Sequence, residues 1–212
     1  MRARTLSGVG ALLFCAALNL SAQVYFRDVT IKPRWSVDPG FSAPNAIEHS
    51  SGKAMYWLEI NVDYKTVPTK GGWMDNVVFK YDILLPAQKG APPVVLTGQV
   101  AYWSIPMDGN VHHAQAFVHP RFLQRYASQL RFKPRELKDL RIRLTILFND
   151  SPVGMGVSKP TTRTDPRTIV AEVAKALANM KTRKVKDSIF SRNETPWAIL
   201  NLDYYELIKR KK

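Results

Sequence analysis

The sequence predicts a mainly β protein with an immunoglobulin-like antiparallel β-sandwich fold. Residues 56–65 (YWLEINVDYK) alternate strictly between apolar and polar side chains, which is typical of a strand with one face on a core and one in water. Several other short segments show the same period and are separated by residues that favour turns. Residues 165–180 instead have a helical period, which predicts one amphipathic helix near the C-terminus.

The N-terminal strands are expected on either side of a long loop. Residues 24–31 (VYFRDVTI) predict the first strand, which we expect Lys32 and Pro33 to end. Residues 36–53 are rich in Ser, Pro, Gly and Asn and predict a loop. In the strand 56–65, the face expected to be buried carries Tyr56, Leu58, Ile60, Val62 and Tyr64. The wet face carries Glu59, Asn61, Asp63 and Lys65, with Trp57 as its one apolar exception.

Three further strands are expected before the pattern changes. Residues 77–85 (VVFKYDILL) alternate like the strand before them. Residues 94–105 also read as a strand, in which Gly98 indicates a bulge or bend. Asp108-Gly109 is typical of a tight hairpin turn, so residues 111–118 are expected to pair with residues 94–105.

The second half mixes helix and strand. Pro120 begins a short helical insertion, expected over residues 121–130, and residues 134–140 predict one further helical turn. Residues 141–148 (RIRLTILF) alternate again, and we expect them to pair with residues 153–157. Asp165 suits an N-cap and Pro166 the first helical position, so the amphipathic helix should begin there. Residues 181–186 (KTRKVK) are interpreted as a basic linker.

Residues 1–22 are typical of a secretory signal peptide. Arg2 and Arg4 precede an apolar run over residues 8–18, and small residues follow before Gln23. An uncleaved N-terminal anchor is the alternative. The remaining residues 23–212 are long enough to form a single domain. Cys15 is the only cysteine, so the exported form should have no disulfide. We expect it in the periplasm, at the outer membrane or outside the cell.

The charge balance favours acidic partners. The chain has a net charge of +14. Anionic lipid, acidic glycans or an acidic protein of the cell envelope are therefore the expected partners, and the export signal argues against nucleic acid. The alternative is dispersed, solvated charge. The candidate acidic-partner patch consists of Arg121, Arg125, Arg131, Lys133, Arg135, Lys181, Arg183, Lys184 and Lys186.

The sequence does not indicate an enzyme, and we expect no metal or cofactor. His113 and His119 would share one face of a strand, but six residues separate them by roughly 20 Å, which is too far for one ion. His112 would point to the other face. Glu59 and Asp63 are spaced carboxylates on a face expected to be wet, which usually only keeps a sheet soluble.

The apolar C-terminal segment, residues 194–208, is the candidate docking element. Its candidate partner-docking residues are Pro196, Trp197, Ile199, Leu200, Leu202, Tyr204 and Tyr205. A segment that is apolar on both faces needs to be covered. It either closes the chain's own sheet as a final strand or adds a strand to another subunit.

The order of these parts resembles a known family. The specific part is the ending Glu194-Thr195-Pro196-Trp197-Ala198, followed by Asp203-Tyr204-Tyr205-Glu206. The family comprises secreted immunoglobulin-like proteins encoded beside type IV pilus-like genes in verrucomicrobial bacteria, including mucin degraders. The resemblance implies a non-catalytic pilus-associated component with a fold similar to the globular domain of archaeal type IV pilins. The prepilin cleavage site is absent, which fits an accessory protein better than a polymerised pilin.

Two other functions stay open. A carbohydrate-binding adhesin would use exposed aromatic residues such as Trp35, Trp73 or Trp103 as stacking platforms, together with the basic surface. Aromatic residues of sandwiches more often belong to the core. A periplasmic hydrolase would need His113 or His119 in a deep pocket beside a carboxylate.

Overall fold

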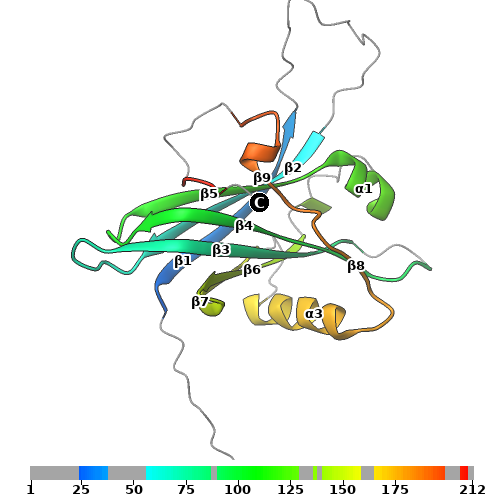
Figure 1. Cartoon of the computed structure of the whole chain (residues 1–212). Helices are drawn as coiled ribbons and strands as arrows, with labels where there is room; N and C mark the ends of the chain where they lie inside the picture. Colours follow the sequence, from blue (N-terminus) through cyan, green and yellow to red (C-terminus); the bar gives the residue numbers. More distant parts are fainter. Residues whose placement is uncertain are drawn as a thin grey trace, which may run out of the picture.

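Two β-sheets face each other across one hydrophobic core in the computed structural model of the chain (Figure 1). The structure describes residues 24–37, 56–86, 90–128, 136–137, 140–158, 165–198 and 206–209. The mainly β prediction is confirmed, and the arrangement is that of a β-sandwich. Whether the sandwich is immunoglobulin-like stays a prediction.

The first sheet has four antiparallel strands. In spatial order they are β1 (Phe26–Val37), β2 (Tyr56–Thr66), β5 (Val111–Val118) and the two-residue strand β9 (Phe190–Ser191). The strand β2 confirms most of the predicted buried face, because Leu58, Ile60, Val62 and Tyr64 are all buried, while Tyr56 is half-buried. These side chains form the first sheet's contribution to the core.

The second sheet has five strands. In spatial order they are β7 (Ser151–Val157), β6 (Arg141–Phe148), β3 (Trp73–Leu84), β4 (Val94–Pro106) and β8 (Arg183–Val185). Its pairs are antiparallel except β4 with β8, which is parallel. Phe79 of β3 packs edge-on against Tyr64 of the first sheet at 5.3 Å between ring centroids. Such contacts join the two sheets through aromatic rings.

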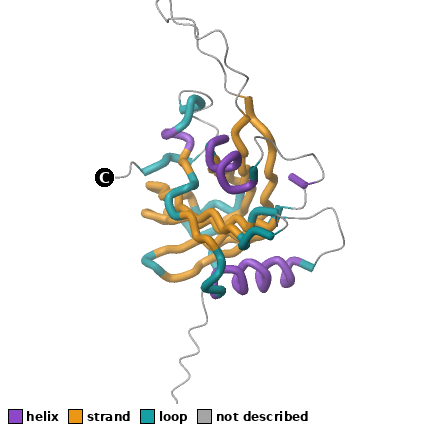
Figure 2. The backbone as a smooth tube through the Cα atoms, turned by 90° about the vertical axis from the view of Figure 1, so that its right-hand side faces the viewer, coloured by secondary structure: helices purple, strands orange, loops and turns teal. Residues whose placement is uncertain are grey.

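Helices lie outside the sheets. The helix α1 (Pro120–Ala127) follows β5, and α3 (Pro166–Ala178) lies against the outer face of the second sheet (Figure 2). The predicted start of α3 is confirmed, since Asp165 Oδ1 accepts a hydrogen bond from the Arg167 N–H at 2.9 Å. A short 3₁₀ helix, η1 (Arg192–Glu194), follows β9.

The expected end of the first strand is wrong. The strand β1 runs through Lys32 and Pro33 to Val37, with Pro33 opposite Ile60 of β2. It is an edge strand, and proline is tolerated there because its missing N–H can face away from the sheet. The first two residues of the expected loop, 36–37, therefore belong to β1. Residues 38–53 of that loop lie outside the described residues, as does the expected signal peptide.

The expected hairpin of residues 94–105 with 111–118 is also wrong. The strands β4 and β5 lie in different sheets, so the turn at Asp108-Gly109 carries the chain across the sandwich. Asp108 Oδ1 accepts the Asn110 N–H at 2.8 Å, and Gly109 has φ +80°. The local turn chemistry was identified correctly, but it does not specify which strands pair.

The basic linker expected at residues 181–186 contains a strand. Residues 183–185 form β8, and the Arg183 N–H donates to the Pro93 carbonyl at 2.9 Å. The edge of β4 would otherwise present unpaired backbone groups, and this short segment covers part of it. Of the helical turn expected at 134–140, residues 136–137 are helical and 140 is not; the other four lie outside the described residues.

Gly98 does not form a bulge. The pairing of β3 with β4 passes through Tyr81 and Gly98 without a shift. A Cβ atom at Gly98 would lie 2.6 Å from the Cβ of Ile189, a residue that is completely buried. The glycine is therefore needed for the close approach of the returning C-terminal chain to β4.

None of the helices among the described residues is both long and apolar enough to cross a membrane.

We predict that Gly98→Ala destabilises the protein by about 1–3 kcal/mol, because the added methyl group forces Ile189 away from β4. Gln99→Ala, an exposed change in the same strand, serves as the control and should cost much less. Urea unfolding of both variants measures the difference. Equal stability of Gly98→Ala and the native protein would show that Ile189 does not pack as described.

Candidate interaction surface

Two segments of the predicted basic patch, one on α1 and one on β8, meet at one tyrosine ring. The Arg183 guanidinium carbon of β8 lies 4.8 Å from the centroid of the Tyr126 ring on α1. Arg125 lies 5.2 Å from the same centroid. Arg121 is four residues before Arg125 and shares its helix face. We call Arg121, Arg125, Tyr126 and Arg183 the arginine–tyrosine patch.

Aromatic packing holds the Tyr126 ring of the patch against the sandwich. Phe122, one helical turn before Tyr126, stacks on it at 6.2 Å between ring centroids. Phe122 also contacts Phe190 of β9 at 6.0 Å. The Tyr126 ring is therefore fixed to the sandwich, and the arginines that contact it have a defined platform.

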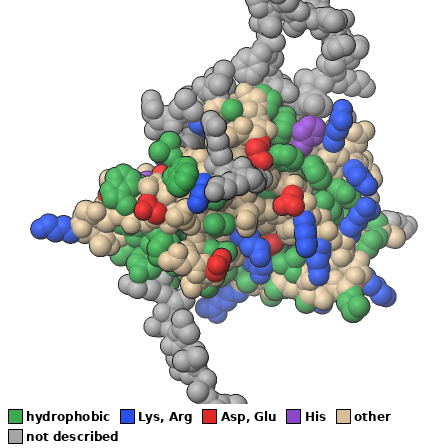
Figure 3. Space-filling view, viewed as in Figure 1, with side chains coloured by type: hydrophobic (Ala, Val, Ile, Leu, Met, Phe, Trp, Pro, Cys, Tyr) green, Lys and Arg blue, Asp and Glu red, His purple; other side chains and the backbone are tan. Residues whose placement is uncertain are grey.

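The cations of the patch are exposed, and none of them forms an ion pair with a carboxylate of the described residues. Lys181, Lys184 and Lys186 are also exposed and flank Arg183 along the chain. Figure 3 shows that Lys and Arg side chains gather on the side of the molecule that carries α1 and β8. Arg131, Lys133 and Arg135 of the predicted patch lie outside the described residues.

The C-terminal docking residues divide into two groups. Of the predicted set, Pro196 and Trp197 are described, and Trp197 is half-buried. Its ring stacks on Phe117 at 5.1 Å and meets Trp57 edge-on at 5.7 Å. The other predicted docking residues lie outside the described part of the chain: Ile199, Leu200, Leu202, Tyr204 and Tyr205.

Residues 207–209 pair with the chain's own second sheet, and the Glu206 N–H donates to the His113 carbonyl of the first sheet at 3.4 Å. The Trp103 N–H donates to the Leu207 carbonyl at 2.9 Å, and the Lys209 N–H donates to the Ala101 carbonyl at 2.7 Å. These bonds lie on the same edge of β4 that β8 covers farther along. At these residues the C-terminal segment packs on the chain's own sandwich.

Trp57, which the sequence places on a face expected to be wet, is instead the centre of an aromatic cluster. It is 5% exposed and also contacts His119 at 4.6 Å and Phe190 at 6.2 Å. His119 is the N-cap of α1, and its Nδ1 accepts the Arg121 N–H at 3.1 Å. The lone apolar residue among polar neighbours was the sequence signal that this end of the face is covered.

The same face carries a buried carboxylate, which corrects the expectation that Glu59 is wet. Glu59 is 2% exposed and pairs with Arg34 at 2.6 Å. It also accepts a hydrogen bond from Gln115 at 2.7 Å and contacts the Ser36 hydroxyl. The partners come from both neighbouring strands and satisfy the buried charge, so removing either one would leave Glu59 uncompensated.

Asp63 lies farther along this face between two donors. Lys32 Nζ contacts its Oδ2 at 2.6 Å, and His113 Nδ1 donates to its Oδ1 at 2.8 Å. Burial alone would raise the pKa of Asp63, but hydrogen bonds from Lys32 and His113 and their charges lower it overall. A depressed pKa makes this carboxylate a poor general acid at neutral pH.

His112 joins the C-terminal segment to the β4–β5 turn. Its Nδ1 lies 2.8 Å from Glu206 Oε1, and its Nε2 lies 2.9 Å from Asp108 Oδ1. Its ring stacks on Tyr64, whose hydroxyl donates to Glu206 at 3.2 Å. Both ring nitrogens face carboxylates, and only the imidazolium can donate from both. The hydrogen bond with Glu206 is the main cause of the raised pKa of His112, against an opposing effect of burial.

The fold and this surface define a β-sandwich protein with an exposed cation patch. A protein-family model matches residues 18–212. The chain therefore belongs to that family. No curated protein matches the sequence.

A solved structure from Akkermansia muciniphila has a similar fold. Its TM-score is 0.61 at 16% sequence identity, and the match covers 88% of this chain and 96% of that chain. At this identity the similarity establishes the fold. The family match over residues 18–212 confirms part of the predicted resemblance, and the pilus association stays a prediction.

We predict that the His112 contacts stabilise the protein in a pH-dependent way. Because the folded pKa of His112 is raised above 6.5, its contribution is fully present below that pH. The contribution is lost as the pH rises through the folded pKa. The measurement is the free energy of unfolding of the native protein and of His112→Gln between about pH 6 and pH 9.

The two curves should lie farthest apart at the acidic end and converge toward the alkaline end. A separation that does not change across this range would show that His112 is not held as an imidazolium between Asp108 and Glu206.

Proposed function

We propose that the protein is a non-catalytic interaction component of a type IV pilus-like surface system. Exported by residues 1–22, it would bind an acidic partner of the cell envelope through the arginine–tyrosine patch. One observation carries the proposal: arginines from two separate segments converge on the Tyr126 ring and pair with no carboxylate of the described residues.

The chemistry of arginine supports this use of the patch. A guanidinium is planar and offers paired donors that match a carboxylate, phosphate or sulfate group. Contact with the Tyr126 ring holds Arg125 and Arg183 in place, which lowers the entropy lost when they bind. Salt should therefore weaken the binding of an acidic partner, because the interaction is electrostatic and exposed.

The pilus part of the proposal is supported by the C-terminal motif, which resembles that of a pilus-associated family. A role as an accessory protein fits better than a role as a polymerised pilin, since the prepilin cleavage site is absent from the sequence. Among the described residues, the carboxylates Glu59 and Asp63 are engaged in ion pairs on the sheet. This supports a function that depends on surfaces.

Photo-cross-linking in the native cell envelope tests the proposal. A photo-reactive residue replaces Gln124, which is exposed on α1 beside Arg125. We expect adducts with proteins of the pilus-like system, and we expect Arg125→Ala/Arg183→Ala to reduce them about tenfold or more, because it removes two charge-assisted contacts. Mass spectrometry identifies the adducts.

The matched control is Lys70→Ala/Lys80→Ala, which removes the same net charge at two exposed residues elsewhere. It should leave the adducts intact. Adducts that survive the arginine double variant, or that disappear equally in the control, would contradict a specific role of the patch. Adducts with proteins unrelated to that system would contradict the pilus assignment.

A carbohydrate-binding adhesin is the second candidate, favoured by two exposed indole rings. Trp73 is 65% exposed and Trp103 is 50% exposed. Lys209 Nζ lies 4.7 Å from the centroid of Trp103 and occupies one side of that ring. Trp35 is partly buried against the core. Trp73 is therefore the better stacking platform.

This second function predicts saturable binding on a glycan array that Trp73→Ala weakens about tenfold, the usual size of one aromatic stacking contact. Leu207→Ala, another exposed apolar residue, is the control and should have little effect. The pilus proposal predicts instead that no glycan shows saturable binding sensitive to Trp73.

A further inference from the structure

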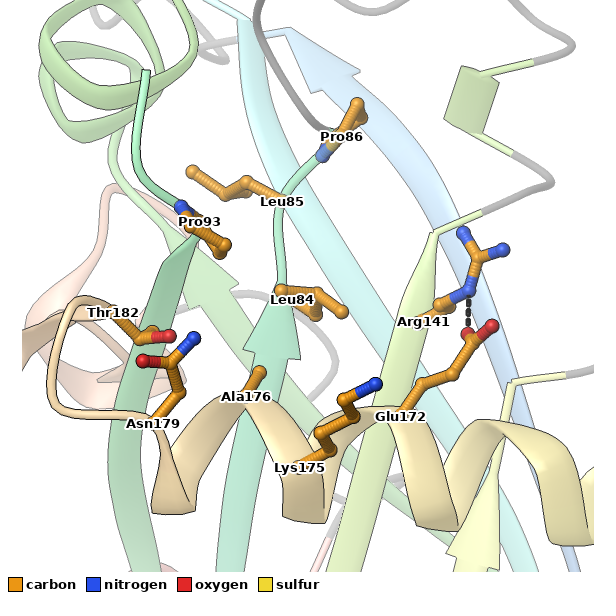
Figure 4. Close-up of a pocket in the computed structure, with 10 residues that line it drawn as sticks. All are labelled: Leu84, Leu85, Pro86, Pro93, Arg141, Glu172, Lys175, Ala176, Asn179 and Thr182. Atoms are coloured by element: carbon orange, nitrogen blue, oxygen red, sulfur yellow. Dashed lines mark hydrogen bonds and ion pairs between the residues drawn. The ribbon is translucent and has the colours of Figure 1, made fainter. Parts of the chain in front are cut away.

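A cavity lies between the C-terminal half of α3 and the ends of β3 and β4 (Figure 4). Its volume is about 380 Å³, which falls within the range of small-molecule sites. The wall is mainly apolar, and its apolar residues are Leu84, Leu85, Pro86, Pro93 and Ala176. The cavity is separate from the arginine–tyrosine patch and from the C-terminal segment.

One end of the cavity has an unsatisfied hydroxyl group. Thr182 is 6% exposed, and its buried Oγ1 has no hydrogen-bond partner among the described residues. Asn179 lies beside it, and its Oδ1 accepts the Lys181 N–H at 2.9 Å. Figure 4 shows the Asn179 amide nitrogen turned toward the apolar wall. A buried polar group of this kind usually has a partner. The Oγ1 is itself buried, so a polar group of a ligand at this end would reach it once the Thr182 side chain turns toward the cavity.

The other end carries positive charge. Lys175 lines the cavity and forms no ion pair with the described residues. Figure 4 shows its ammonium group extending from α3 toward the cavity. Arg141 Nε bonds Glu172, and the two terminal amino groups of the guanidinium have no ion pair with the part of the chain that the structure describes. This end of the cavity therefore has two cations and one carboxylate in its lining, and the net positive charge fits an anion.

We propose that this cavity binds a small amphipathic carboxylate, such as a hydroxylated medium-chain acid. The apolar body would lie against Leu84, Leu85 and Pro93. The carboxylate would lie beside Lys175 and Arg141, and a hydroxyl at the other end would bond Thr182 Oγ1. The inference goes beyond the interaction proposed above and does not depend on it, because it uses other residues.

Nuclear magnetic resonance of the purified protein tests this binding. The probes are octanoate, 1-octanol and 8-hydroxyoctanoate, and the signals are the methyl groups of Leu84, Leu85 and Ala176. We expect octanoate to shift these methyl groups in a saturable way below about 10 mM. The neutral octanol should bind more weakly, and 8-hydroxyoctanoate more tightly than octanoate.

Two variants separate the two ends. Lys175→Met should weaken octanoate binding about five- to tenfold and leave octanol binding unchanged, because it removes the charge and keeps the length of the side chain. Lys70→Met, an exposed lysine on the β2–β3 turn, is the matched control and should have no effect. Thr182→Val should remove the preference for 8-hydroxyoctanoate.

Three results would overturn the proposal. The first is the absence of saturable shifts at these methyl groups. The second is an equal loss of octanoate binding in Lys175→Met and Lys70→Met. The third is octanol binding as tight as octanoate binding in the native protein. Lys175 is exposed, so its variant remains informative even if Thr182→Val fails to fold.

Discussion

The pairing of one edge of β4 is the constraint on which the rest of the structure depends. This edge is covered successively by β8, by Ser188 and by residues 207–209. The Ser188 N–H donates to the Thr97 carbonyl at 3.1 Å, between the two other pairings. The chain crosses to the first sheet at β9 on the way, so one C-terminal segment joins both sheets. An unpaired edge of this length would expose backbone groups and invite association with other chains.

One part of the arginine–tyrosine patch and one end of the cavity follow from this return of the chain. The strand β8 brings Arg183 to the Tyr126 ring, and the turn before β8 places Thr182 at one end of the cavity. Residues 206–209 bring Glu206 to His112 and place Lys209 over Trp103. Ile189 fills the space left by Gly98 and closes the core between these contacts. The pairing of the C-terminal segment with β4 therefore brings together residues that are far apart in the sequence.

The sequence predicted what local chemistry determines. Period-two alternation identified the buried face of β2, and Asp165-Pro166 located the start of α3. It did not predict which strands pair, because a turn such as Asp108-Gly109 has the same chemistry within a sheet or between sheets. It predicted one basic patch from two segments but not the tyrosine ring between them, since Tyr126 has no local feature that separates it from a core aromatic residue. The burial of Glu59 was not predicted, because its partner Arg34 lies beyond the predicted end of the first strand.

Native-state amide hydrogen exchange measures this edge pairing most directly. The account predicts that the amides of Trp103, Arg183 and Lys209 exchange slowly, because each donates to a carbonyl across the edge of β4. Their protection should be similar to that of amides between β3 and β4. Exchange of the Trp103 and Lys209 amides at the rate of an unstructured chain would contradict the account. It would mean that residues 207–209 do not close this sheet in solution.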